Sequence, residues 1–205
     1  MTASLGTNRL RYPRALQAVI VALLMSAMAD AGPNLITNGS FETPLVPAGK
    51  FTNFAGGSTD ITGWTVAGLE ASVVHSTFTS FLIQFTASDG LQWLDLTGFL
   101  ASAGETVKQA VPTVIGKRYH LSFAVGNVFN RYGIYGTTST VAVTVNGVPL
   151  GTFTNSCTTC TTRLNWENFT VSFVADGPTA VIEFLNRDPV TDNCNGLDNV
   201  VLTEG

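Results

Sequence analysis

The sequence predicts an all-β fold, a jelly-roll β-sandwich of about ten strands, and three observations support this prediction. From residue 32 onward, apolar and polar side chains alternate in short runs, which is the two-residue period of a strand with one buried face. Turn-forming residues separate these runs, and no window has the apolar spacing of a helix. Apolar residues make up 45% of the chain, which suffices for the core of one domain, predicted to span residues 32–205.

The first 31 residues have the features of a secretory signal peptide. Three arginines precede an apolar run that begins at Ala15, and the run ends in Ala29-Asp30-Ala31, an A-x-A cleavage site. The run is shorter than the roughly 20 residues that a membrane-spanning helix needs. We therefore expect the protein to be secreted into an extracellular or periplasmic space.

The charge of the predicted mature chain excludes one class of partner. Removing residues 1–31 leaves 7 basic residues (10 minus 3) and 13 acidic residues (14 minus 1), a net charge of −6. An acidic chain without a basic patch is unsuited to bind nucleic acid.

The clearest strand signals lie in the second half of the chain. Residues 119–125 place a large apolar side chain at every second position, and residues 141–145 repeat the pattern. Asn146-Gly147 then supplies the strongest short-range hairpin signal, and residues 148–153 form the return strand. The other predicted strands are residues 40–42, 64–66, 72–75, 91–96, 106–111, 168–173, 180–185 and 197–202. Two long loops, 44–63 and 126–140, lie between them, and loops of this length are often functional.

Three runs carry a resemblance to a known family: residues 34–42 (NLITNGSFE), 57–66 (GSTDITGWTV) and 89–98 (DGLQWLDLTG). Their order and spacing resemble the bacterial choice-of-anchor C family, which is similar to a plant cell-wall protein family of unknown function. The resemblance covers nearly all of the predicted mature chain. It implies a galactose-binding-like jelly roll, similar to non-catalytic carbohydrate-binding modules. The family often carries a C-terminal surface anchor, which this chain lacks, so release from the cell is expected.

A structural calcium ion is predicted where the two ends of the chain meet. Glu42 lies in the first predicted strand and Asp198 in the last, so both carboxylates are neighbours if the termini pair in one sandwich. Hard oxygen ligands suit calcium, and the related modules carry such a site. The predicted ligands are Glu42, Asp198 and backbone carbonyls near Asn38. The alternative is that Glu42 caps a turn and Asp198 only occupies a loop.

No arrangement of residues typical of a hydrolase is present in the sequence. His75 and His120 stand far apart, and no Gly-x-Ser-x-Gly motif occurs. The carboxylates that could form a hydrolytic pair, Glu42, Asp89, Asp95 and Asp198, are scattered along the chain. We therefore expect that the chain is not an enzyme.

Three cysteines in a secreted chain predict one disulfide and one remaining thiol. Cys157 and Cys160 lack the helix start of a redox pair and the further ligands of a zinc site. Pairing of Cys160 with Cys194 is favoured over pairing of Cys157 with Cys160. The longer bridge would stabilise the fold by roughly 3 to 4 kcal/mol.

A carbohydrate-binding surface is predicted at Trp93 and the loop 126–140. Trp93 and Asp95 share one face of a strand, as an aromatic platform beside a carboxylate. Tyr132 and Tyr135 are the further stacking candidates. The candidates for pairing with sugar hydroxyls are Asp95, Asn127, Asn130 and Arg131. The alternatives are that a loop covers Trp93 and that the tyrosines pack only their own loop.

The predicted function is non-catalytic binding of an extracellular or cell-wall polysaccharide. The alternative function is that of a structural or adhesive extracellular matrix protein that binds other proteins.

Overall fold

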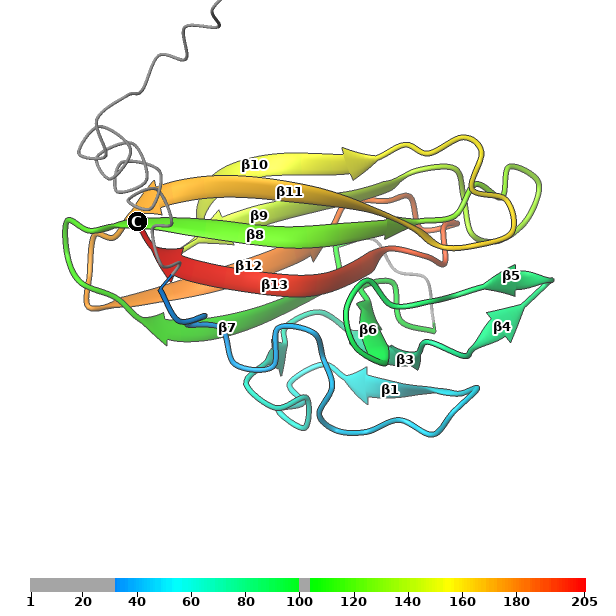
Figure 1. Cartoon of the computed structure of the whole chain (residues 1–205), viewed down its shortest axis with the longest axis horizontal. Helices are drawn as coiled ribbons and strands as arrows, with labels where there is room; N and C mark the ends of the chain where they lie inside the picture. The colour runs from blue at the N-terminus through cyan, green and yellow to red at the C-terminus, as the bar shows by residue number, and fades with distance from the viewer. Residues whose placement is uncertain (1–31, 100–103) are drawn as a thin grey trace, which may run out of the picture. The chain divides into compact units, whose positions relative to one another are not determined.

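The computed structural model describes residues 32–99 and 104–205, which fold into thirteen strands (Figure 1). The six-stranded sheet has the order β1 (Phe51–Ala55), β3 (Glu70–His75), β6 (Gln92–Asp95), β13 (Gly196–Glu204), β8 (Arg118–Asn127) and β11 (Asn165–Val174). The five-stranded sheet has the order β10 (Val148–Asn155), β9 (Ser139–Val145), β12 (Thr179–Asn186), β7 (Thr106–Pro112) and β2 (Thr65–Val66). A separate hairpin consists of β4 (Thr79–Ser80) and β5 (Ile83–Gln84).

All paired strands within these sheets are antiparallel, and non-consecutive strands are neighbours in both sheets, so the predicted all-β jelly roll is confirmed. Within the described residues there is no helix, and thus none that could span a membrane. The predicted signal peptide lies outside the described residues and stays a prediction.

The main core lies between the two large sheets. Strand alternation in β8 buries Leu121 and Phe123, and the same period in β12 buries Phe184, whose ring meets that of Phe123 at 5.1 Å between centroids. Each fully buried side chain of this size contributes about 1.5 to 3 kcal/mol relative to an exposed one. The apolar side chains that alternate along these strands therefore pack between the two sheets and stabilise the sandwich.

A second, smaller core covers the opposite face of the six-stranded sheet. Val73 and Leu94 belong to the main core, whereas their strand neighbours Val74 and Trp93 belong to the second core. Because successive side chains of a strand point to opposite faces, β3 and β6 supply both cores. The remaining buried members of the second core are Ile83, Phe85, Val128, Tyr135, Leu164 and Cys194.

The two ends of the domain lie side by side. The backbone N–H of Leu35 donates to the carbonyl of Leu202 at 2.8 Å, and the N–H of Val200 donates to the carbonyl of Gly39 at 2.9 Å. The predicted strand at residues 40–42 is wrong, because Phe41 has a φ of 56° and lies in a turn. This turn directs the Phe41 ring into the main core, 5.3 Å from Trp64.

The predicted Cys160–Cys194 disulfide is also wrong. Cys157 and Cys160 are bridged, with their Cα atoms 5.8 Å apart, within the range that a disulfide spans. Cys194 is a free thiol buried in the second core, and burial raises its pKa well above the ordinary value. Sequence spacing alone could not show that Cys194 is buried in the second core.

Candidate functional site

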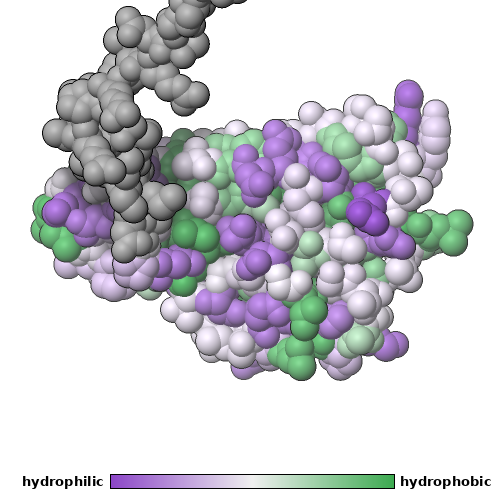
Figure 2. Space-filling view, viewed as in Figure 1, coloured by the Kyte–Doolittle hydropathy of each residue, from purple (hydrophilic) through white to green (hydrophobic). Residues whose placement is uncertain are grey.

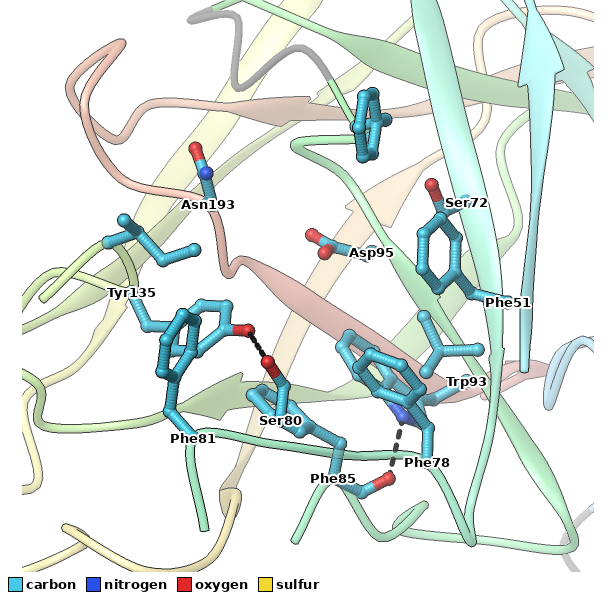
Figure 3. A pocket seen from close by; sticks show the side chains of 14 residues that line it. Phe51, Ser72, Phe78, Ser80, Phe81, Phe85, Trp93, Asp95, Tyr135 and Asn193 are labelled. Carbon is cyan, nitrogen blue, oxygen red and sulfur yellow. Dashed lines mark hydrogen bonds between the residues drawn. The ribbon is translucent and has the colours of Figure 1, made fainter. Parts of the chain in front are cut away.

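A cavity of about 250 Å³ opens beside the second core, and half of the residues that line it are aromatic. Figure 3 shows these rings and a few polar side chains facing a common space. The aromatic walls are Phe51, Phe78, Phe81, Phe85, Trp93, Phe99 and Tyr135, and the polar walls include Ser72, Ser80, Asp95 and Asn193. A concave, largely apolar space with a few polar groups is the usual form of a small-molecule site.

Trp93 and Tyr135 form a fixed wall of this cavity. The Trp93 indole is 1% exposed and donates its Nε1–H to the carbonyl of Phe85 at 3.0 Å. The hydroxyl of Tyr135 donates to Ser80 Oγ at 2.7 Å, as the dashed line in Figure 3 marks. The Phe85 ring lies between them, stacked on Trp93 at 6.2 Å and edge-on to Tyr135 at 5.0 Å. Trp93 is therefore a covered wall and not a solvent-facing platform.

Asp95 is the carboxylic acid among the residues that line the cavity (Figure 3). Its Oδ1 accepts hydrogen bonds from the N–H of Thr97 at 3.0 Å, the Thr97 hydroxyl at 2.8 Å and the N–H of Asn195 at 3.1 Å. Burial nevertheless raises the pKa of Asp95 to about 6, and the charge of Glu70 adds to the rise. The carboxyl group can thus hold or release a proton near neutral pH.

Two further carboxyls are buried behind Asp95, in the loop between β12 and β13. Burial raises the pKa of Asp188 to about 7 and that of Asp192 to about 8, where the charge of Asp188 adds to the effect. Asp188 Oδ1 accepts from the N–H of Thr140 at 2.7 Å, whereas its Oδ2 and the Oδ1 of Asn195 have no hydrogen-bond partner. Within residues 32–99 and 104–205, no group of three or more His, Cys, Asp and Glu side chains is arranged to hold a metal ion.

A second, more open hollow of about 780 Å³ contains another part of the predicted carbohydrate surface. Asn130, Arg131 and Tyr132 line it, and the guanidinium of Arg131 lies 5.5 Å from the centroid of the Tyr132 ring. The Tyr132 side chain is 93% exposed, so its ring is available for contact.

Asn127, the remaining predicted carbohydrate ligand, is fully buried and has structural partners. Its Nδ2 donates to the carbonyls of Thr137 and Cys157, both at 3.3 Å, and its Oδ1 accepts from the Ser139 hydroxyl at 3.3 Å. The structure thus brings Trp93, Asp95 and Tyr135 together in the cavity, leaves three predicted residues at the hollow and removes Asn127 from both.

The predicted calcium ligands lie near one another but are engaged by backbone N–H groups. Glu42 Oε1 accepts from the N–H groups of Leu91 and Gln92 at 2.7 and 2.8 Å. Asp198 Oδ2 accepts from the N–H groups of Ser88 and Asp89 at 2.7 and 2.9 Å, and burial raises the pKa of Asp198 to about 7. Asn38 pairs through its side chain with Thr43 and Thr62. A calcium ion held by these residues stays a prediction.

A family model described as a protein of unknown function, DUF642, matches residues 34–202.

The chain belongs to the DUF642 family. The resemblance to the choice-of-anchor C family stays a prediction. No curated protein matches the sequence of this DUF642 protein.

Several solved structures share the fold. A Stig cyclase from Fischerella sp. TAU, in complex with (3Z)-3-(1-methyl-2-pyrrolidinylidene)-3H-indole, is 18% identical, with a TM-score of 0.58 over 85% of this chain and 98% of the cyclase. An apo cyclase from Fischerella sp. is also 18% identical, with a TM-score of 0.59 over 84% of this chain and 95% of that one. A family 35 carbohydrate-binding module from an environmental isolate is 16% identical, with a TM-score of 0.47 over 74% and 92% of the two chains.

The prediction that this DUF642 protein is not an enzyme is contradicted by the cyclase structures. The prediction relied on the absence of hydrolase motifs, and the same jelly roll occurs in proteins that catalyse a different class of reaction. A fold alone does not determine whether a site binds or reacts, so the earlier exclusion does not hold.

Sequence reasoning missed most of the aromatic walls. Phe51 belongs to β1, a strand in the segment that was predicted to be a loop. Phe78 directly precedes the short β4–β5 hairpin, and Phe81 lies in the turn of that hairpin. Strands of two residues are too short to show a two-residue period. The available signal was the concentration of phenylalanine between residues 78 and 85, which exceeds what an ordinary surface loop needs.

Proposed function

We propose that this DUF642 protein is secreted and binds one ring of an extracellular or cell-wall glycan in the aromatic cavity. The observation that carries the proposal is that seven aromatic side chains surround a space into which Asp95, Ser72 and Ser80 bring oxygen atoms. A sugar ring has apolar faces that pack on aromatic rings, and its hydroxyls pair with carboxylates and hydroxyls. The signal-peptide features of residues 1–31 support the proposed secretion.

Asp95 would fix the orientation of the sugar. Its Oδ1 is occupied by the three donors from Thr97 and Asn195, and in the described part of the chain its Oδ2 has no hydrogen-bond partner. Figure 3 shows this carboxyl between the Ser72 side and the Asn193 side of the cavity. An acceptor that faces an otherwise apolar space is suited to select a ligand hydroxyl.

A glycan array with the purified protein tests the proposal. We expect a defined glycan to be retained, and Phe99→Ala to weaken its binding without unfolding the domain, because this ring lines the cavity and is 66% exposed. Ile115→Asn is the matched control, since Ile115 is equally exposed in a turn that does not line the cavity. A silent array together with self-association would overturn the proposal in favour of a structural or adhesive protein.

A second candidate function is acid catalysis on the bound molecule. It is favoured by the Asp95 carboxyl, which is held against apolar rings with a pKa raised to about 6 and can donate a proton near neutral pH. The test is to incubate the glycans retained on the array, and the indole compound of the cyclase complex, with the protein and with Asp95→Asn. A product seen by mass spectrometry only with the unchanged protein would support catalysis, and no product with either would overturn it.

A further inference from the structure

The aromatic cavity and the open hollow share part of their walls. Phe81 and Ile134 line both spaces, so the two spaces adjoin at these side chains. The cavity holds about 250 Å³ and the hollow about 780 Å³.

The turn that carries Phe81 has an unfavourable backbone conformation. Phe81 and Leu82 connect β4 to β5 as a two-residue hairpin loop, with φ values of 48° and 64°. A two-residue loop with positive φ at both positions strongly prefers Asn-Gly, because bulky side chains clash with the backbone there. The chain uses this favoured pair in its other tight hairpin, where Asn146 and Gly147 between β9 and β10 have φ values of 51° and 78°.

Packing in the domain explains little of why a phenylalanine and a leucine occupy this turn. The Phe81 side chain is 75% exposed and that of Leu82 is 95% exposed. The Phe81 ring meets the second core edge-on at Tyr135, with 6.2 Å between the ring centroids. Figure 2 shows a hydrophobic projection at the right edge of the molecule, where the β4–β5 hairpin ends in Figure 1. Strained residues that the core does not need are typical of ligand-binding elements.

The hollow itself offers contacts for a second ring. Tyr132 stands almost fully exposed on its rim, and Arg131 lies over the Tyr132 ring. Asn130 and Thr161 add polar groups to the same wall. The hollow therefore combines a stacking surface with hydrogen-bonding groups, whereas the cavity is mainly aromatic.

We propose that the cavity and the hollow form one continuous groove for a ligand of at least two linked rings, with Phe81 as the shared wall. The first ring lies in the cavity and the second lies on the Tyr132 side of Phe81. The inference rests on the proposed function, for which it names the ligand class as a disaccharide unit or longer chain rather than a single sugar. The strained turn keeps Phe81 between the two rings.

The test uses N-phenyl-1-naphthylamine, a neutral fluorescent molecule of two linked ring systems, with the full domain. In the double variant Phe81→Asn with Leu82→Gly, the turn acquires the favoured pair, so we expect a higher melting temperature together with dye binding that is weaker by at least about fivefold. In Tyr132→Ala we expect an unchanged melting temperature and dye binding weaker by about threefold or more. Ile115→Asn, which removes an exposed apolar side chain elsewhere, should change neither quantity.

Each other outcome overturns the inference. A lower melting temperature of the double variant would mean that Phe81 and Leu82 stabilise the fold, and an unchanged dye affinity would mean that they do not contact a ligand. An unchanged affinity in Tyr132→Ala would confine binding to the cavity. The ligand class is tested on the glycan array, where we expect disaccharides and longer chains to be retained more strongly than monosaccharides. Equal retention of monosaccharides would overturn the inference and leave the proposed function standing, whereas a silent array would be failure of the proposed function.

Discussion

Replacing Asp95 with asparagine should stabilise the protein at pH 8 and leave its stability nearly unchanged at pH 4. The carboxyl has a pKa of 3.8 in the unfolded chain and about 6 in the folded one, because burial disfavours its charged form. Between these values the folded chain binds more protons than the unfolded chain, so the free energy of unfolding falls as the pH rises and the loss is complete above pH 6. A shift of roughly 2 pKa units corresponds to about 3 kcal/mol.

Asparagine keeps the acceptor oxygen for Thr97 and Asn195 but cannot acquire a negative charge. For a domain of this size, about 3 kcal/mol raises the melting temperature by roughly 6 to 12 °C. The assay is thermal unfolding of Asp95→Asn and of the unchanged protein at pH 4, 6 and 8. Asp60→Asn, which removes the same charge from an exposed loop, controls for net charge. A difference in melting temperature that is the same at pH 4 and pH 8 would refute the reasoning.

Three further predictions follow from the same structure. Trp93→Ala should lower the free energy of unfolding by about 3 to 5 kcal/mol, because the Trp93 side chain is buried and hydrogen-bonded to the carbonyl of Phe85. Urea denaturation measures this change, and an unchanged midpoint would contradict the burial of Trp93 in the cavity wall. Loss of the Cys157–Cys160 disulfide should lower the free energy of unfolding by only about 2 kcal/mol, since the bridge closes a very short loop. Peptide mapping without reduction should find Cys194 as a free thiol, and a disulfide to Cys194 would contradict the assignment. If the predicted calcium ion is bound at about 100 times its dissociation constant, a chelator should remove roughly 2.7 kcal/mol of stability, and identical melting curves with and without chelator would exclude it.

The parts of the fold that were predictable are those governed by local alternation. Strands β8, β9 and β12 each bury one face against the main core, so every second residue is apolar and the pattern is visible in the sequence. The strand predicted at residues 40–42 is instead a turn, closed by the hydrogen bond from the N–H of Phe41 to the carbonyl of Asn38 at 3.1 Å, and alternation over three residues could not reveal it. The β4–β5 hairpin was missed because its Phe81-Leu82 turn lacks the residues that normally mark such a turn.

The candidate site was predictable in part for the same reason. The two-residue period placed Trp93 and Asp95 on one face of β6, and both do line the cavity. The period could not show that this face is covered by the second core, which depends on segments distant in sequence. Nor could it show that Asn127, at the end of β8, turns inward to bond Ser139. Side-chain direction at a strand end depends on tertiary partners, which local sequence does not encode.

The two ends of the chain also position the candidate site. Glu42, near the start of the domain, and Asp198, near its end, bind backbone N–H groups on the two sides of Gly90. Gly90 has a φ of 68°, a conformation that residues with a Cβ atom rarely adopt, so glycine suits this position beside the Glu42 carboxylate. The segment so held leads directly into β6 and Trp93. The carboxylates predicted to hold a metal ion thus bind the segment that leads into the strand carrying Trp93 and Asp95.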